Sequence, residues 1–322
     1  MTISAKIIAH SRSAFHGSET AHCPDLITFQ LRYPRFIHAE VMTHRLFSRN
    51  ASSSRAIPVE TMIKNIIADT AMPIHWGKNQ SGMQAHEEQD TLVNIGDEFP
   101  HESLVTASAA GAWCVARDKA IKVATAFHKA GYHKQVVNRI LEPFMHIDVI
   151  VTASNFDNFF WLRRHPDAQP EIRVLADAMW EALQASTPHR LNPGEWHLPY
   201  VREIEKTMRA PRELAPGVIV IEAVTTEVLI KLSVARCARV SYLTHDGKEP
   251  DFAKDVALYE RLVGSEPLHA SPAEHQAIPD EPNWYDGGVQ WDRADLSGNF
   301  DGGWVQYRKT LSGEHCDKYE VV

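Results

Sequence analysis

One long alanine-rich segment, residues 102–130, constrains the fold of this chain more than any other feature. It contains no proline, and Gly131 follows it, a residue type that often comes directly after the last turn of a helix. The pattern therefore predicts a single long helix. Residues 133–142 resume the helical pattern and stop near Pro143.

Both strands and helices are predicted in the rest of the chain. KIIAH and LITFQLRY, within the first 42 residues, have the composition of strands. MHIDVIVTAS, residues 145–154, has β character in part, and its type stays open. Helical spacing of apolar residues predicts a helix at residues 170–185 (Ile172, Leu175, Met179, Leu183). We expect further helices at residues 59–70, 225–242 and 252–263.

Three regions show no such periodicity. Residues 73–100 and 278–322 look irregular, and five prolines in residues 187–216 predict a connection over the surface.

The four cysteines lie far apart without a C-x-x-C pair, which predicts reduced thiols rather than disulfides or a zinc site. No apolar run could span a bilayer, and the N-terminus lacks the apolar stretch of a signal peptide. We therefore expect a cytoplasmic enzyme, of a cell or of a virus, with no membrane association.

The first polar cluster, THRLFSRNASSSR at residues 43–55, follows an apolar segment, residues 27–42. Arginine binds phosphate and planar oxygens, and serine hydroxyls add short-range donors. The cluster is a candidate anion-binding loop; the alternative is a solvated basic loop. The net charge of −8 argues against a dedicated nucleic-acid binder, so we expect no nucleic-acid partner.

The second cluster is NFDNFFWLRRHPDAQPEIR, residues 155–173. Asn155 and Asn158 offer amides, and Arg163 supplies a cation next to another arginine. The aromatic residues 159–161 could stack on an aromatic ligand, although packing in the core is the commoner outcome. Arg139 lies just ahead of this cluster, near a predicted helix end.

The third cluster is LHASPAEHQ, residues 268–276. Locally it could be a helix start, with Ser271 as the N-cap and Glu274 completing a capping box. A ligand site there is the functional alternative. The chain has no GxGxxG, Walker-type, HExxH or GxSxG motif, and its 18 histidines show no ligand spacing, so we expect no metal.

Taken together, the clusters resemble the flavin-dependent thymidylate synthases. The family signature is Arg-His-Arg, seven residues, Ser and a further Arg; here His44-Arg45, seven residues, Ser53 and Arg55 match it. Leu162-Arg163 through Ala168-Gln169 and Glu171-Ile172 is similar to the family's L-R-x4-A-Q-x-E-I. R-I-L-E-P, residues 139–143, resembles its R-x-x-L-P, with Glu142 in place of leucine.

The order of the blocks is rotated relative to that family. A-R-V-S-Y at residues 238–242 and H-x-S-P-x-E-H at residues 269–275 normally precede the signature, but here they follow it. The resemblance implies a circular permutation, with a flavin-binding block at about residues 225–276 and residues 187–216 as the joining connection. Residues 278–322 have no counterpart in the family.

The resemblance implies an α+β fold, with an antiparallel-rich sheet packed with long helices, in one catalytic domain spanning residues 1–322. It implies an FAD-dependent homotetramer that transfers a one-carbon unit from methylenetetrahydrofolate to C5 of a pyrimidine nucleotide, most simply dUMP to dTMP, with NADPH as reductant. Arg163 would be catalytic, stabilising negative charge on the pyrimidine. FAD would contact His44, Arg45, Asn155, Asn158, Ser241, His269, Ser271 and Glu274. The nucleotide would contact Glu40, Ser53, Arg55, Arg139 and Arg163.

Four departures from the family pattern bear on the substrate. Thr43 replaces its first arginine, Ala51 a glutamate, Ala56 a tyrosine, and Gln135 a glutamate. Changed polar groups often change the accepted substrate, because unmatched donors are costly. dUMP, UMP and dCMP therefore stay open, as does a hydroxymethyl product. A nucleotide-binding homologue without catalysis is the further alternative.

Overall fold

The computed structural model of the chain describes residues 2–17, 23–96, 106–216, 218–241, 248–249, 251–285 and 288–316. Its centre is a five-stranded sheet of order β3-β6-β2-β1-β7. The strands are β1 (Ser4–Ser13), β2 (Leu26–Pro34), β3 (Ser48–Ala51), β6 (His146–Ala153) and β7 (His189–Leu191). All neighbouring pairs are antiparallel except β1 with β7. The predicted α+β fold with an antiparallel-rich sheet is confirmed.

The two innermost strands, β2 and β6, are buried along nearly their whole length. Their sequences, LITFQLRYP and HIDVIVTA, are almost continuous runs of apolar and β-branched residues, as expected of strands covered on both faces. The sequence left the type of residues 145–154 open, and the structure shows that they form a strand. Its polar residue Thr152 is fully buried, because the second face of the sheet is covered as well.

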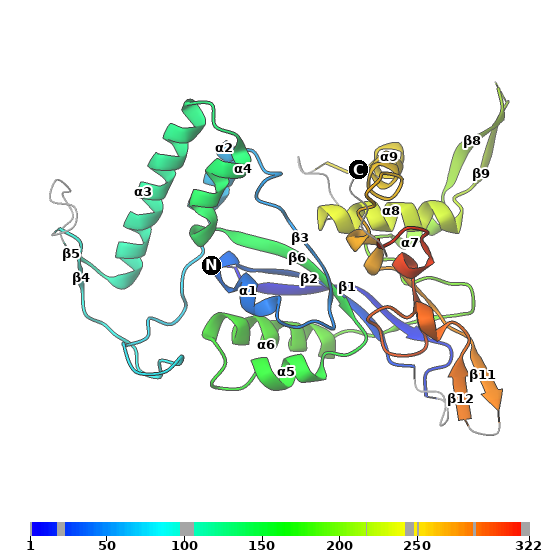
Figure 1. Cartoon of the computed structure of the whole chain (residues 1–322), viewed down its shortest axis with the longest axis horizontal. Helices are drawn as coiled ribbons and strands as arrows, with labels where there is room; N and C mark the ends of the chain where they lie inside the picture. The colour runs from blue at the N-terminus through cyan, green and yellow to red at the C-terminus, as the bar shows by residue number, and fades with distance from the viewer. Residues whose placement is uncertain are drawn as a thin grey trace.

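One face of the sheet packs against α5 (Asp157–Arg163) and α6 (Pro170–Gln184), as Figure 1 shows. The predicted helix at residues 170–185 is confirmed, and Ile172, Leu175 and Met179 are fully buried against strand residues such as Phe29. Gln169 is the N-cap of this helix, and its side chain accepts from the Ile172 amide at 3.0 Å.

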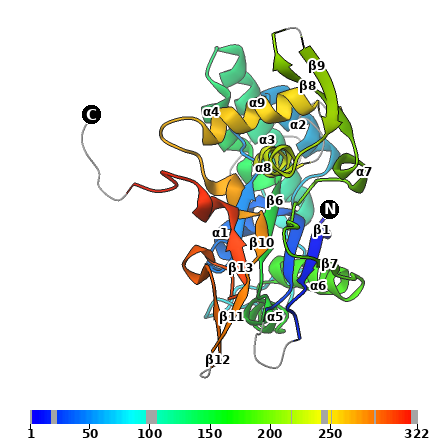
Figure 2. The ribbon, with the colours of Figure 1, turned by 90° about the vertical axis from the view of Figure 1, so that its right-hand side faces the viewer.

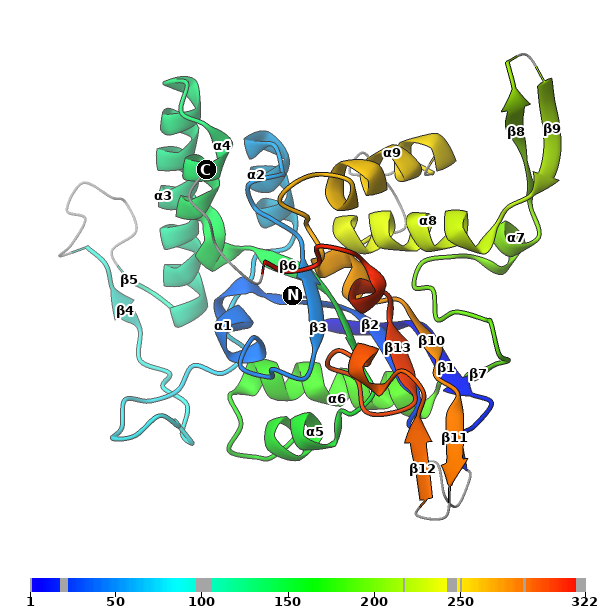
Figure 3. The same cartoon turned by 45° about the vertical axis from the view of Figure 1, so that its right-hand side comes forward.

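The other face is covered by the C-terminal half of the chain. α8 (Thr226–Arg239) and α9 (Phe252–Val263) lie on the side of the sheet opposite α5 and α6 (Figure 3). Cys237 and Val240, at the end of α8, pack with Tyr200 and the strand residue Ile150. Both predicted helices are confirmed, although α8 ends earlier than residue 242.

A helical group stands beside the sheet (Figure 1). It comprises α2 (Val59–Ala68), α3 (Ala109–Lys129), α4 (Lys134–Val137) and the 3-10 helix η2 (Asn138–Phe144). α3 begins seven residues after the predicted start, where Ser108 caps it by accepting from the Gly111 amide. The predicted end at Gly131 is confirmed by its left-handed φ of 85°. Only the first turn of residues 133–142 is α-helical, since Pro143 lies in the 3-10 continuation.

Two regions predicted to be irregular contain regular structure. Residues 187–216 hold β7, α7 (Glu203–Lys206) and β8 (Arg209–Ala215), which pairs with β9 (Val218–Ala223). The C-terminal region holds the pair β10 (Ala277–Pro279) and β13 (Trp304–Gln306), and the hairpin β11 (Pro282–Tyr285) with β12 (Gly288–Trp291). Figure 2 shows the hairpin extending beyond the sheet. The strands of the C-terminal region have only three or four residues each, too few to show periodicity in sequence.

The remaining elements are short. They are the helical turns η1 (Arg35–Ile37), α1 (His38–Val41), η3 (Ser271–Glu274), η4 (Ala294–Leu296) and η5 (Tyr307–Thr310), and the strand pair β4 (Val93–Asn94) with β5 (Thr106–Ala107). No helix in the described ranges has the length and apolarity needed to cross a membrane.

Candidate functional site

The end of α5 carries Arg163 against the loop between α1 and β3. Its Nε donates to His44 Nε2 at 2.9 Å, and its Nη2 donates to Thr43 Oγ1 at 3.3 Å. Phe159, one turn earlier on the same helix face, meets the His44 ring edge-on with centroids 4.9 Å apart. The predicted first and second clusters are therefore in direct contact.

His44 is a neutral acceptor in this contact. Burial, followed by the positive charges of Arg163 and Arg49, lowers the pKa of His44 to about 4. Because Arg163 donates to Nε2, the ring proton must be on Nδ1. Arg49 also holds the loop itself, since its Nη1 donates to the carbonyls of Met42 and His44 at 2.7 and 3.0 Å.

These contacts orient the Arg163 guanidinium. Two of its nitrogens, Nε and Nη2, are held, whereas Nη1 has no hydrogen-bond partner within the described ranges. Thr43 is held in turn, because its hydroxyl donates to the Glu40 carbonyl at 2.7 Å. Arg163 is half-buried, and one N–H of Nη1 together with the second N–H of Nη2 forms a fixed donor pair for a planar acceptor.

A second group forms where the turn after β3 meets η2. Asn138 is fully buried, and its Nδ2 donates to the carbonyls of Ser54 and Ile57 at 2.7 and 2.9 Å. This joins the turn carrying Ser53 and Arg55 to the helix carrying Arg139. Asn138 was not predicted, and nothing in the sequence marks it, since its role depends on two carbonyls far away in the chain.

Glu142, which stands in place of leucine in the family's R-x-x-L-P, is the centre of this group. It accepts from Ser54 Oγ at 2.8 Å and pairs with Arg139 at 3.1 Å and Arg35 at 3.2 Å. One carboxylate thus holds two arginines beside the turn. Arg35 was missed because the family pattern does not include it.

The two groups lie at opposite ends of β3. This strand has four residues, so about 10 Å separates its first and last Cα atoms at the usual rise per residue. His44, which Arg163 contacts, precedes the strand in the chain, and Ser53 and Arg55 follow it. The site is therefore elongated along an edge strand of the sheet.

The third cluster packs against β3 and β6. His275 is fully buried, with Nδ1 2.8 Å from Thr152 Oγ1, and Thr152 pairs with Ser48 of β3. The predicted capping box is wrong, because Ala270 is the N-cap of η3, and no side chain caps it. The Glu274 carboxylate pairs with Arg308 of the C-terminal region instead.

Most of the other predicted site residues expose their side chains. Asn155 lies just before α5, and its Oδ1 accepts from the Asp157 amide at 2.9 Å. Ser241 is half-buried just after α8, and Tyr242 of the same motif lies outside the described residues. The exposed members are Glu40, Arg45, Ser53, Arg55, Arg139, Asn155, Asn158, His269 and Ser271.

A buried chain of polar groups crosses the sheet next to this site. His197 lies 2.8 Å from both Ser11 Oγ and Thr28 Oγ1, and Thr28 Oγ1 lies 2.7 Å from Thr152 Oγ1. Thr152 then contacts His275. Burial lowers the pKa of both histidines to about 3, so both are neutral. His197 was not predicted.

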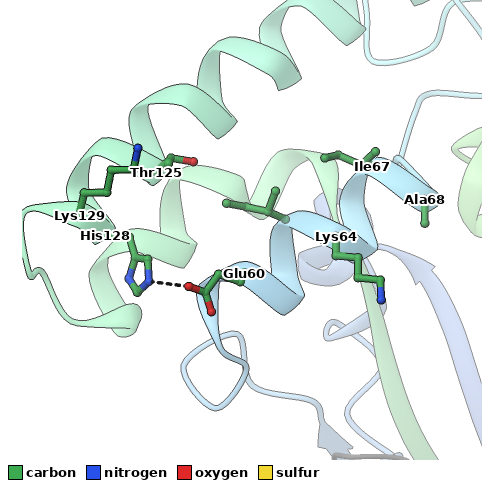
Figure 4. A pocket seen from close by; sticks show the side chains of 8 residues that line it. Glu60, Lys64, Ile67, Ala68, Thr125, His128 and Lys129 are labelled. Atoms are coloured by element: carbon green, nitrogen blue, oxygen red, sulfur yellow. Dashed lines mark hydrogen bonds and ion pairs between the residues drawn. The ribbon is translucent and has the colours of Figure 1, made fainter.

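A cavity of about 720 Å³ lies elsewhere, between α2 and α3 (Figure 4). Ile63 and Ile67 line it on one side, and His128, paired with Glu60 at 3.3 Å, closes one end. It contains none of the predicted site residues. Among the described residues, no group of three or more His, Cys, Asp or Glu side chains could hold a metal.

Comparison with known proteins was made for sequence and for structure. No curated protein sequence matches the chain. Two crystal structures of a UMP/dUMP methylase, PolB from Streptomyces cacaoi, are similar to it. The structure bound with 5-Br dUMP has 17% identity and a TM-score of 0.40, covering 56% of this chain and 90% of that chain. The structure bound with 5-Br UMP has 18% identity and a TM-score of 0.42, covering 56% and 89%.

The family model Thy1, described as thymidylate synthase complementing protein, matches residues 2–189. The match contains the first two clusters and ends before the third. It spans more than half of the 322 residues. The chain therefore belongs to the Thy1 family of flavin-dependent thymidylate synthases.

Proposed function

We propose that this protein transfers a one-carbon unit from methylenetetrahydrofolate to C5 of a pyrimidine nucleotide, most simply converting dUMP to dTMP, with FAD as cofactor and NADPH as reductant. The observation that carries the proposal is the orientation of Arg163 by Thr43 and His44. Family membership supports the same reaction class.

Arg163 is suited to face the pyrimidine. Its free edge offers two parallel N–H donors, one from Nη1 and one from Nη2, which match a carbonyl oxygen of the uracil ring and the adjacent N3 once N3 has lost its proton. A permanent cation there stabilises negative charge that develops on the ring when C5 reacts. Neutral His44 orients this cation without adding a competing positive charge.

The group at the other end of β3 is suited to the phosphate. We propose that Ser53, Arg55 and Arg139 bind it, with Glu40 as a further contact to the nucleotide. Arg55 and Arg139 are exposed, and Glu142 fixes the direction of Arg139. The elongated arrangement fits a ligand whose base and phosphate lie apart.

FAD would lie along the same edge. The donor set fits a flavin dinucleotide, because exposed Arg45, Asn158 and Ser271 supply a cation, an amide and a hydroxyl. We propose His44, Asn155, Ser241 and His269 as further contacts. Glu274 fits less well, because its carboxylate is already paired with Arg308. When bound, the reduced flavin supplies the hydride.

We also propose that residues 1–322 form one catalytic domain with a permuted flavin-binding block at about residues 225–276, in a homotetramer. The packing of His275 on Thr152 supports the permuted order, because it brings the third cluster beside the first in space. The chain order of the blocks then matters less than their common position at β3.

Incubating the full chain with FAD, NADPH, methylenetetrahydrofolate and 5-tritiated dUMP tests the function. We expect tritium release, and the product mass separates a methyl from a hydroxymethyl group. UMP and dCMP serve as alternative substrates in the same assay. A colourless protein that takes up no FAD would contradict the proposal.

The Arg163→Ala variant should lower kcat/KM by roughly 10²–10³-fold, the usual effect of removing a charge-stabilising donor. Arg164→Ala is the matched control, because the neighbouring Arg164 pairs with Asp177 at 2.8 Å, away from His44. Equal activities of the two variants would refute the role of Arg163.

A further inference from the structure

The C-terminal segment, residues 298–308, has no counterpart in the family pattern, yet it lies against the candidate site. β3 is an edge strand of the sheet, and among the strands of the described residues only β6 pairs with it. An edge strand presents unpaired backbone groups and is usually covered by another element. Here η3 and the C-terminal segment lie beside it (Figure 3).

Asn299 fastens the loop that leads from His44 into β3. Its Nδ2 donates to the Leu46 carbonyl at 2.7 Å, and its Oδ1 accepts from Ser48 Oγ at 3.0 Å. Ser48 is fully buried, so its hydroxyl depends on protein partners. Asn299 thereby holds both ends of the peptide segment between Leu46 and Ser48.

Gln306 connects that loop to the third cluster. Its side chain is buried, and its Nε2 lies 3.2 Å from Ser48 Oγ, 2.8 Å from Asn299 Oδ1 and 3.1 Å from the Glu274 carbonyl. Arg308, two residues further, pairs with the Glu274 carboxylate. The turn carrying Ser271 and Glu274 is thus tied to the loop carrying His44 and Arg45.

Asp301 reaches the start of the second cluster. Its amide donates to Ser154 Oγ at 2.8 Å, and the same hydroxyl donates to Asp301 Oδ2 at 3.2 Å. Ser154 directly precedes Asn155. The C-terminal segment therefore contacts three of the four chain segments that carry the proposed FAD contacts, all except the one with Ser241.

The segment is itself anchored in a small core. Trp304 is fully buried, and its Nε1 donates to the Pro24 carbonyl at 2.8 Å. β13 pairs with β10, so that Pro279 lies opposite Trp304. A segment held in this way can keep three loops at fixed positions.

We propose that Asn299 and Gln306 are positioning residues of the FAD site, which fasten the loop after His44 to the turn at Ser271. This inference rests on the proposed function. The loops come from distant parts of the chain, and β3 has only four residues to order them. The C-terminal segment fixes the positions of these loops relative to one another, and FAD binds to the loops so arranged.

The test measures FAD binding by the visible absorbance and quenched fluorescence of the flavin, together with the thermal unfolding midpoint. In Asn299→Ala and Gln306→Ala we expect the Kd for FAD to rise about tenfold, as for the loss of one or two hydrogen bonds. The unfolding midpoint of Asn299→Ala, at a partly exposed position, should match that of Asn283→Ala, whereas Gln306→Ala removes a buried amide and should also lower the midpoint. Asn283 is an exposed control in the same region, bonded only within the β11–β12 part of the described chain.

A double variant tests the route of the effect. Because Asn299 and Gln306 contact each other and both contact Ser48, Asn299→Ala with Gln306→Ala should weaken FAD binding by less than the two single losses added together. Additive losses would overturn the proposal, as would unchanged FAD binding in both single variants. So would a weaker binding in Asn299→Ala that only follows a fall in its unfolding midpoint. If the wild-type chain takes up no FAD, the proposed function fails as well, whereas the preceding outcomes leave it standing.

Discussion

At the scale of single residues, Thr43 is the clearest departure with a structural consequence. A threonine hydroxyl both donates and accepts, and Thr43 uses both abilities, towards the Glu40 carbonyl and Arg163 Nη2. An arginine here would repel the Arg163 guanidinium. With threonine in place of the family's arginine, position 43 therefore carries a hydroxyl that orients Arg163 rather than a second cation.

Thr43→Val should consequently lower kcat/KM by about tenfold, the usual effect of losing one hydrogen bond to a charged group. Valine keeps the shape of the side chain but removes the hydroxyl. Thr43→Ser, which keeps the hydroxyl, is the control and should retain wild-type kcat/KM. Steady-state kinetics with dUMP measures both. Equal activity of the valine and serine variants would show that the hydroxyl does not orient Arg163.

At the scale of elements, α8 is held to α7 and α9 by buried charges. The Arg236 guanidinium pairs with Glu205 at 2.7 Å and with Asp255 at 2.9 Å, and all three side chains are essentially unexposed. Arg239 adds a second contact to Asp255 at 2.7 Å. Burying such charges is costly, so each depends on its partner.

Glu205→Ala should lower the free energy of unfolding by about 3–5 kcal/mol, because it leaves Arg236 with an unbalanced buried charge. Glu203→Ala is the matched control in the same helix. Glu203 is exposed and pairs with Lys206 at 2.6 Å, and its loss should cost less than about 1 kcal/mol. Urea unfolding of both variants provides the measurement. Similar losses would mean that the buried pair contributes little.

At the scale of the whole molecule, the chain of buried polar groups from Ser11 to His275 joins the N-terminal sheet to the C-terminal half. Both of its histidines are fully buried and neutral. For His197 the main cause is burial, and a proton on His275 or His10 would repel one on His197. Protonating either histidine would place an uncompensated positive charge in the buried layer between the sheet and the C-terminal half that covers it.

Stability should therefore fall as the pH is lowered. In the unfolded chain these histidines titrate near pH 6.5, but in the folded chain their pKa is about 3. Their contribution is complete above about pH 6.5 and is lost towards pH 3, by up to about 1.4 kcal/mol per pH unit for each histidine. His197→Gln should reduce this slope in urea unfolding between pH 7 and 5, whereas His165→Gln, at an exposed position, should not. An unchanged slope in His197→Gln would contradict the assignment.

Much of the fold could be predicted because local patterns matched the elements. Apolar spacing located α6, and the glycine after α3 located its end. The apolar runs of β2 identified a buried strand. The short strands of the C-terminal region could not be predicted, since β10 and β13 have three residues each and are stabilised by distant contacts.

The candidate site was predictable only in part. Motif spacing identified His44 and Arg163, which the structure brings to 2.9 Å from each other. It did not identify Asn138 or Asn299, because an amide that binds a distant carbonyl leaves no pattern in its own neighbourhood. It also misassigned Ser271 as a helix cap, because Arg308 competes for the Glu274 carboxylate.

The sequence by itself determined the longer helices, the strand β2 and the family signature, since periodicity and residue type act over short distances along the chain. Only the tertiary structure decided which of the three clusters meet, and that residues 298–308 lie beside them. The physical reason is that these contacts are hydrogen bonds and ion pairs across more than a hundred residues, such as Asn299 with Leu46 and Arg163 with His44. Their partners are chosen by the packing of the sheet, which no local pattern records.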